Sequence, residues 1–185
     1  MLGNYSIKNM KRLNEYIKES LLDVDDFDLD KAIKNDVKSF LKANYKGRYS
    51  ISKNPNADGK YVVDSKGNIE IKNKSITNLT NGCFVWGKVD GEFDCIYCTS
   101  LTSLEGAPKE VGGSFSCNGC RSLKTLKGAP EKVGEGFICS YCNSLTSLEG
   151  APKEVGGGFH CTNCCIKFIE DDVRKVSNVK GKINC

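Results

Sequence analysis

Cysteines are the residues of this chain whose type and spacing could do chemistry. Eleven are present among 185 residues, and eight of them form four CxxC pairs with 18 residues between consecutive pairs. The pairs are Cys95 with Cys98, Cys117 with Cys120, Cys139 with Cys142, and Cys161 with Cys164. Two pairs at this spacing can supply the four thiolates of a structural zinc site. A zinc-dependent nucleic-acid-binding protein, with these eight cysteines as metal ligands, is therefore one hypothesis.

The cysteine pairs lie inside a longer repeat that zinc binding does not explain. A unit of 22 residues begins at Phe93, recurs at Phe115 and Phe137, and has a partial copy at Phe159. Each full copy also repeats two leucines, a Gly-Ala-Pro corner and a valine. One coil of this length is too thin to bury its apolar side, so neighbouring coils must cover it. The repeat predicts a solenoid with short parallel strands, in which equivalent cysteines stack ~5 Å apart instead of converging on an ion.

The solenoid prediction gives the cysteines a structural role. Phe93 and Cys95 are two residues apart, so both side chains point to the same face of an extended segment. Free cysteine behaves as a small buried hydrophobe. We therefore expect reduced cysteines in the core and no cofactor. Disulfides between coils are an alternative, although the odd number of cysteines and the lack of an apolar signal-peptide core weigh against a complete set.

The repeated frame also carries a resemblance. F-x-C-x-x-C-x-x-L-x-x-L-x-G-A-P-x-x-V-G resembles a leucine-rich repeat, and most closely the short bacterial class of BspA-like proteins. It departs from that class in the Gly-Ala-Pro corner and in its second cysteine. The resemblance implies a curved stack with a parallel sheet on one face, and partner binding rather than catalysis. The expected fold class is an α+β repeat, a leucine-rich-repeat-like solenoid.

The flanking segments predict caps for the array. Residues 1–46 form a helical N-terminal segment, with apolar residues at helical spacing over 10–21 and again before Gly47. Residues 47–88 alternate apolar and polar residues between turn signals, which predicts a β-meander that ends in a degenerate first coil. The repeats occupy 89–166. Residues 167–185 predict a C-terminal cap with a short charged helix and the start of one more coil.

The N-terminal segment carries a second, shorter resemblance. Residues 10–20, MKRLNEYIKES, resemble the leader of proteins that T-even-like tailed phages pack into the head. Such leaders are cut after a glutamate that follows Leu or Ile by two positions, and Ile17-Lys18-Glu19 fits that rule. The resemblance implies a phage protein that is packaged into the virion. The alternative is an ordinary amphipathic helix that packs on the array or on a partner.

Catalysis, membrane insertion and electrostatic nucleic-acid binding have little support. His160 is the only histidine, and other units carry Asp94, Ser116 or Ile138 at its position, so a histidine-dependent triad is not favoured. The net charge of +4 is too small to indicate a nucleic-acid partner by itself. No stretch approaches the ~20 apolar residues of a membrane helix. We expect a non-enzymatic protein located in the cytoplasm of a bacterial host, or in a virion.

The variable residues beside the fixed ones are the candidate binding site. If each phenylalanine and first cysteine point inward, the outward residues can contact a protein partner. They are Asp94, Ile96, Tyr97, Ser116, Asn118, Ile138, Ser140, Tyr141, His160 and Thr162. Tyr97 and Tyr141, two units apart, should lie ~10 Å from each other, and aromatic residues flanked by small polar groups are typical of contact surfaces. The alternative is that these are tolerated surface residues.

Overall fold

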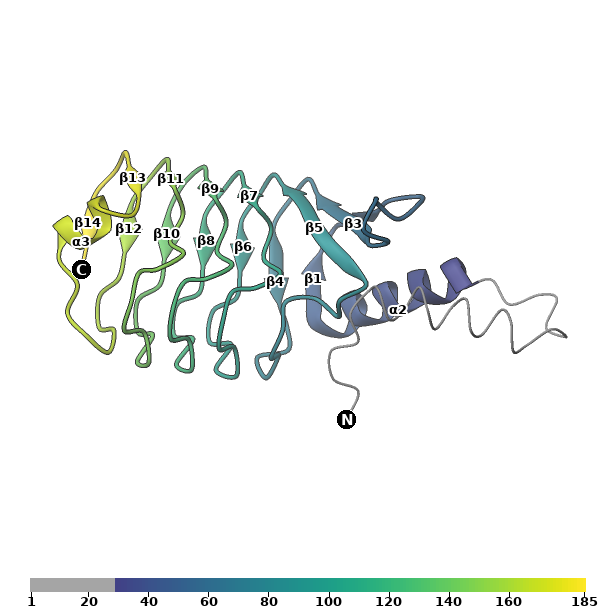
Figure 1. The fold of residues 1–185 in the computed structure, drawn as a ribbon, viewed down its shortest axis with the longest axis horizontal. Coiled ribbons are helices and arrows are strands. Elements are labelled where there is room, and N and C mark those ends of the chain that lie inside the picture. Colours follow the sequence, from purple (N-terminus) through teal and green to yellow (C-terminus); the bar gives the residue numbers. More distant parts are fainter. Residues whose placement is uncertain (1–28) are drawn as a thin grey trace, which may run out of the picture.

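The computed structural model describes residues 29–185, which form a β-solenoid whose coils stack in a nearly straight row (Figure 1). The expected helix over 10–21 and the phage-like leader lie outside the described residues. Two seven-stranded sheets run along the solenoid. We call them sheet A, in the order β1-β4-β6-β8-β10-β12-β14, and sheet B, in the order β13-β11-β9-β7-β5-β3-β2.

Sheet A contains the phenylalanine of every repeat. Its strands are β1 (Tyr45–Gly47), β4 (Ile69–Ile71), β6 (Phe93–Asp94), β8 (Phe115–Ser116), β10 (Phe137–Ile138), β12 (Phe159–His160) and β14 (Ile183–Asn184). From β4 to β14 the neighbours are parallel and in register, so that Phe115 lies opposite both Phe93 and Phe137. The rings of Phe93 and Phe115 stack with centroids 5.6 Å apart. One 22-residue repeat of the sequence therefore forms one coil of the solenoid.

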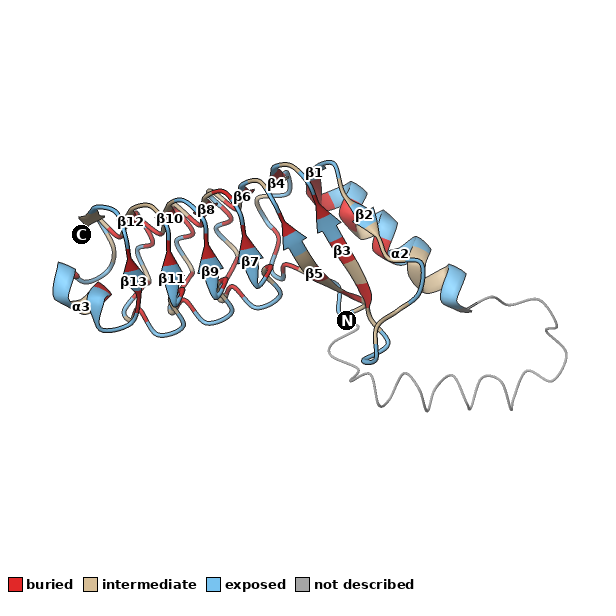
Figure 2. Ribbon diagram, turned by 90° about the horizontal axis from the view of Figure 1, so that it is seen from above, coloured by how far each residue is buried: buried red, intermediate tan, exposed pale blue. Residues whose placement is uncertain are grey.

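Sheet B contains the repeated valine. Its strands are β2 (Ser50–Ile51), β3 (Tyr61–Ser65), β5 (Phe84–Val89), β7 (Glu110–Val111), β9 (Lys132–Val133), β11 (Glu154–Val155) and β13 (Asn178–Val179). Val89, Val111 and Val133 are opposite one another and buried. Figure 2 shows that buried positions recur at the same place in successive coils. The core is a continuous column between the two sheets, which also includes the repeated leucines and most of the cysteines.

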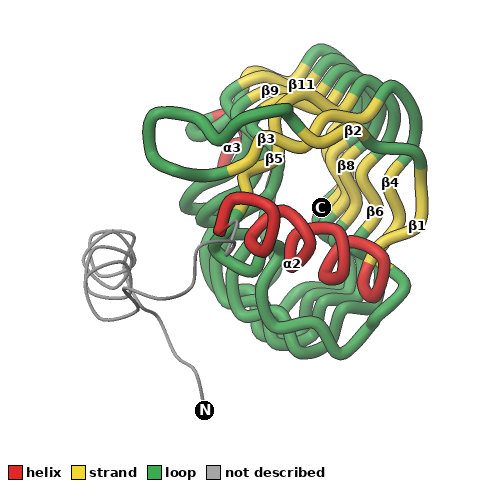
Figure 3. Tube along the Cα trace, turned by 90° about the vertical axis from the view of Figure 1, so that its right-hand side faces the viewer, coloured by secondary structure: helices red, strands yellow, loops and turns green. Residues whose placement is uncertain are grey.

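A helix covers the N-terminal end of this column. Helix α2 (Leu29–Asn44), the second of the expected helices, lies across the opening of the first coils (Figure 3). Val37 and Leu41 are fully buried against the core. The hydroxyl of Tyr45, directly after the helix, donates a hydrogen bond of 2.6 Å to the carbonyl of Leu79. This hydrogen bond joins the C-terminal end of the helix to the coil that contains Leu79.

The expected β-meander over 47–88 is wrong for most of that segment. Strand β2 pairs with β3 antiparallel, but β3 pairs with β5 in parallel. Between β3 and β5 the chain passes through β4, which belongs to the opposite sheet. The antiparallel pair β2–β3 is present, but a full coil replaces the pairing expected after β3, and the solenoid begins well before Val89.

The leucine-rich-repeat resemblance implied one parallel sheet and a curved stack, whereas the solenoid has two sheets and runs nearly straight (Figure 1). Strand pairing sets a spacing of ~4.8 Å on both sides, so neither side spreads relative to the other. At the C-terminal end, the expected cap consists of helix α3 (Glu170–Arg174) with β13 and β14. These two strands add one more rung to the two sheets.

Candidate functional site

Each repeat turns a corner just after its sheet A strand, and the backbone there is unusual. The residues at this corner are Tyr97, Gly119, Tyr141 and Asn163, with φ angles of 56°, 70°, 58° and 56°. This left-handed conformation is accessible to glycine and tolerated by asparagine, whose short side chain bonds locally. A bulky residue in the same conformation costs roughly 1–2 kcal/mol. Two of the four coils therefore have a tyrosine where the backbone disfavours it.

Hydrogen bonds between coils hold this corner in place. The amide of Tyr97 donates to the carbonyl of Asn118 at 2.8 Å, and that of Gly119 to Ser140 at 2.8 Å. The amide of Tyr141 donates to Thr162 at 2.9 Å. Adjacent corners are therefore one hydrogen-bonded rung apart. Tyr97 and Tyr141 are two rungs apart, which corresponds to ~9.6 Å along the solenoid axis.

The two tyrosines are the most exposed large apolar side chains of the repeats. Tyr97 is 56% exposed and Tyr141 is 53% exposed. A Cβ atom built on Gly119 would lie 2.4 Å from Cδ1 and 2.6 Å from Cε1 of Tyr97. The ring of Tyr97 therefore lies over Gly119, toward the coil of Tyr141. We name Tyr97, Gly119 and Tyr141 the aromatic corner.

A cation follows the aromatic corner in its middle coil. Arg121, two residues after Gly119, is exposed, and within residues 29–185 its side chain makes no salt bridge and no hydrogen bond. Lys109 and Lys124 likewise make no salt bridge within residues 29–185, whereas the remaining lysines of the repeats have carboxylate partners. Lys127 contacts Glu149 at 3.1 Å, and Lys153 contacts Glu131 at 3.0 Å.

Two of the predicted contact residues are not available on the surface. Ser116 and Ser140 are buried, so the expectation that their side chains are exposed on the outer surface is wrong. Each is a short side chain between longer neighbours of the adjacent coils. Ser140 Oγ also accepts hydrogen bonds of 3.1 Å from the amide and from the hydroxyl of Thr162.

The other predicted residues are half-buried, and several have local partners. They are Asp94, Ile96, Asn118, Ile138, His160 and Thr162. Asp94 Oδ1 accepts a hydrogen bond of 2.7 Å from the amide of Ile96, and His160 Nδ1 lies 2.9 Å from the side-chain amide nitrogen of Asn184. Of the ten predicted residues, Tyr97 and Tyr141 are the ones that project into solvent. Sequence analysis missed Arg121. The alternation of tyrosine with glycine and asparagine at one position was the signal for the corner.

The repeated cysteines lie in the core. Cys95, Cys98, Cys117, Cys120, Cys139, Cys142 and Cys161 are buried, and Cys164 is half-buried. The thiol of Cys120 donates to the carbonyl of Cys95 at 3.1 Å, and that of Cys142 to the carbonyl of Cys117 at 3.2 Å. Burial raises the pKa of the Cys95 and Cys139 thiols, which disfavours the reactive thiolate. Within residues 29–185, no group of three or more His, Cys, Asp or Glu side chains could hold a metal ion.

One pair of cysteines departs from the expectation of reduced thiols. Cys161 forms a disulfide with Cys185, and their Cα atoms are 4.6 Å apart. The in-register pairing of β12 with β14 places these two residues at equivalent positions of adjacent coils. The spacing between rungs falls within the Cα separation that a disulfide requires. The expectation of a reduced thiol is therefore wrong for Cys161.

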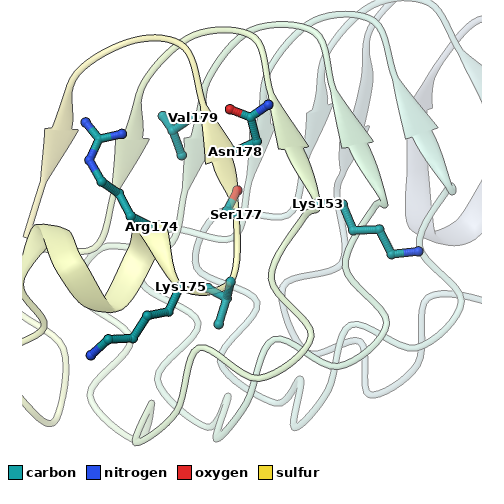
Figure 4. Close-up of a pocket in the computed structure, with 7 residues that line it drawn as sticks. Lys153, Arg174, Lys175, Ser177, Asn178 and Val179 are labelled. Carbon is teal, nitrogen blue, oxygen red and sulfur yellow. The ribbon is translucent and has the colours of Figure 1, made fainter.

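A pocket of about 500 Å³ beside the C-terminal cap contains none of the predicted residues (Figure 4). Its lining includes three cations, Lys153, Arg174 and Lys175, and the buried Ser177, whose hydroxyl has no hydrogen-bond partner among the described residues. The charged ends of these cations point in different directions. Each also contacts a carboxylate, from Glu131, Glu170 and Asp172 respectively. The cations therefore do not converge on one ligand.

Comparison of the chain with protein-family models, with curated proteins and with solved structures finds no match. Neither helix within residues 29–185 is long and apolar enough to cross a membrane.

Proposed function

We propose that this protein is a non-enzymatic module for protein–protein interaction, which presents the aromatic corner on a rigid, leucine-rich-repeat-like solenoid. The observation that carries the proposal is the left-handed conformation of Tyr97 and Tyr141. Strained backbone at a bulky residue is found most often where a side chain has a role in binding. Folding alone favours the glycine or asparagine that the other two coils contain.

The chemistry of the corner supports a protein partner. A tyrosine offers a large apolar ring and a hydroxyl, with few rotatable bonds to restrict on binding, and tyrosines are enriched among the residues that dominate interface energies. The rings are more than half exposed. The coils below them are fixed by backbone hydrogen bonds, so the spacing between the two tyrosine backbones is set before a partner arrives.

We further propose that the protein is a phage accessory or host-interaction protein that acts in the cytoplasm of the bacterial host. The support is the resemblance of residues 10–20 to a phage head leader. Packaging into the virion through that leader is the second candidate function. Mass spectrometry of purified virions tests it: a chain cut after Glu19 supports packaging, and an uncut chain or no chain contradicts it.

The binding proposal is tested by replacing Tyr97 and Tyr141 together with asparagine, the residue that Asn163 supplies at the same corner. Because asparagine tolerates the left-handed backbone, we expect the free energy of unfolding to rise by about 1 kcal/mol, as measured by urea denaturation. We expect the same variant to lose the protein that the wild-type chain captures from host lysate.

A matched control is Thr146→Asn, which changes an exposed residue away from the corner. This variant should capture the same protein as the wild type. Equal capture by the double tyrosine variant and by the control would reject the aromatic corner as the binding site.

A further inference from the structure

We infer that the Cys161–Cys185 disulfide is a redox-sensitive clasp, whose reduction releases strand β14 and opens the C-terminal end of sheet A. The inference goes beyond the proposed function and does not depend on the aromatic corner. The segment that reduction releases consists of residues 180–185, which follow β13 and contain β14. We call it the terminal segment.

The terminal segment lacks the buried side chain that anchors the preceding strands of sheet A. In each of the four preceding coils, the first residue of the strand is a fully buried phenylalanine, whereas Ile183 at this position is half-buried. None of residues 180–185 is buried. The rest of the C-terminal cap differs, because Val173 of α3 and Val179 of β13 are buried. Apolar burial is the dominant favourable contribution to folding, so it holds the cap far more strongly than the terminal segment.

Hydrogen bonds and the disulfide therefore hold the terminal segment. The amide of Phe159 donates to the carbonyl of Lys182 at 2.9 Å, and the amide of Cys161 donates to that of Asn184 at 2.8 Å. Water can replace these hydrogen bonds, so their net contribution to stability is small. The disulfide is the covalent link, and with a sequence separation of 24 it closes the whole last coil into a loop. Its reduction removes the strongest constraint on the segment.

The position of the disulfide favours a redox role over a purely structural one. The equivalent cysteines of the earlier coils, Cys95, Cys117 and Cys139, are fully buried and reduced. Cys185 is half-buried, so a reductant in solution can reach it without opening the core. We have proposed a cytoplasmic location, and disulfides in a reducing cytoplasm are usually transient and redox-sensing.

Reduction by a dithiol proceeds in two exchange steps. A thiolate of the reductant attacks the sulfur of Cys185, the S–S bond breaks, and Cys161 leaves as a thiolate that takes up a proton. The second thiol of the reductant then attacks the mixed disulfide and releases the Cys185 thiol. The protein disulfide gains two electrons and two protons, and the dithiol becomes a disulfide.

Release of the terminal segment changes the end of sheet A. The amides of Phe159 and Cys161 lose their acceptors, and the ring of Phe159 loses the neighbour that Ile183 supplies in the next coil. A strand edge with unpaired amides is a template for the addition of another strand. Reduction thus converts a closed end of the solenoid into an open one.

The test is hydrogen exchange of single amides in the full chain, measured by NMR after treatment with oxidised glutathione and after addition of dithiothreitol. Thiol alkylation and mass spectrometry establish the state of Cys161 and Cys185 in each sample. We expect the amides of Phe159 and Cys161 to exchange about tenfold faster, or more, in the reduced chain. The equivalent amides of Phe115 and Cys117, two coils away, should not change.

Two variants separate the clasp from other effects of the reductant. Cys185→Ser should exchange like the reduced wild type with or without dithiothreitol. Cys165→Ser removes an exposed cysteine outside the disulfide and should respond to dithiothreitol as the wild type does.

Three results overturn the inference. A wild-type chain that forms no Cys161–Cys185 disulfide with oxidised glutathione has no clasp. Protection of the Phe159 and Cys161 amides that survives reduction shows that the disulfide does not hold the terminal segment. Protection that is lost throughout the solenoid shows that the disulfide stabilises the whole fold and is not a local switch.

Discussion

Two surfaces of the repeat array vary from coil to coil, and they vary for different physical reasons. On sheet B, Glu110, Lys132 and Glu154 face one another in adjacent coils, and Lys132 contacts Glu154 at 3.6 Å. We call this row of alternating charges the charge column. At the aromatic corner, the same three coils carry tyrosine, glycine and tyrosine.

The charges in the charge column are paired with opposite charges in the adjacent coils. Identical coils would place like charges directly opposite each other at the strand spacing, which is destabilising. The middle repeat reverses the order of Lys and Glu, so every neighbour becomes an opposite charge. The aromatic corner has no such internal explanation, because its two tyrosines are strained and exposed. The comparison teaches that one surface varies to stabilise the stack, and it supports the proposal that the other varies to meet a partner.

The largest expected effect comes from the core that both surfaces share. Phe137 is fully buried, and its ring centroid lies 5.6 Å from that of Phe115. Phe137→Ala should lower the free energy of unfolding by roughly 3–5 kcal/mol, because it removes a large apolar side chain and leaves a cavity. Urea denaturation measures this loss, with Phe137→Leu as a control that retains most of the volume. A loss below 1 kcal/mol would contradict the continuous core described here.

A rise in pH should also destabilise the core, because its buried cysteine thiols stay protonated to a higher pH than thiols of the unfolded chain. The ordinary pKa of a cysteine thiol is 9.0, and burial raises the pKa in Cys95 and Cys139 and raises that of Cys164 to about 11. Above pH 9 the unfolded chain loses thiol protons that the folded chain retains, so protonated native thiols stabilise the fold below pH 9 and this contribution is lost as pH rises.

The urea midpoint should therefore change little between pH 7.5 and 8.5 and fall between pH 9 and 11. Cys139→Ala should show a shallower fall, since it removes one buried thiol. A midpoint that stays constant up to pH 11 would show that the thiols do not titrate differently in the folded and unfolded chains.

The smallest expected effect is confined to the charge column. Lys132→Glu places three carboxylates in consecutive coils and should cost roughly 0.5–1 kcal/mol at low salt, with a smaller loss at high salt. The triple variant that also contains Glu110→Lys and Glu154→Lys restores alternation among these three coils but places a lysine at position 110 opposite Lys88, so it should recover only part of the stability. Because Lys132 is on sheet B, neither variant should change binding at the aromatic corner. A change in binding would show that the two surfaces are coupled.

The sequence predicts much of the candidate site but not its geometry. Tyr97 and Tyr141 stand out because two neighbouring units carry glycine or asparagine at their position. Ser116 and Ser140 were expected to be exposed, because strand alternation says which side a residue faces but not how far its neighbours project. Arg121 is visible in the sequence as one charge among many. Its lack of a salt bridge to any described residue emerges only when the surrounding carboxylates are placed.

The sequence by itself determined the period of the coil and the residues that fill it, because side chains repeated every 22 residues can be buried only against their own copies. Tertiary structure decided the rest. The second sheet depends on pairing between strands such as β3 and β5, with a complete coil between them. The Cys161–Cys185 disulfide and the left-handed corner likewise arise from how adjacent coils align. Contacts between distant parts of the chain set these features, and local patterns do not encode them.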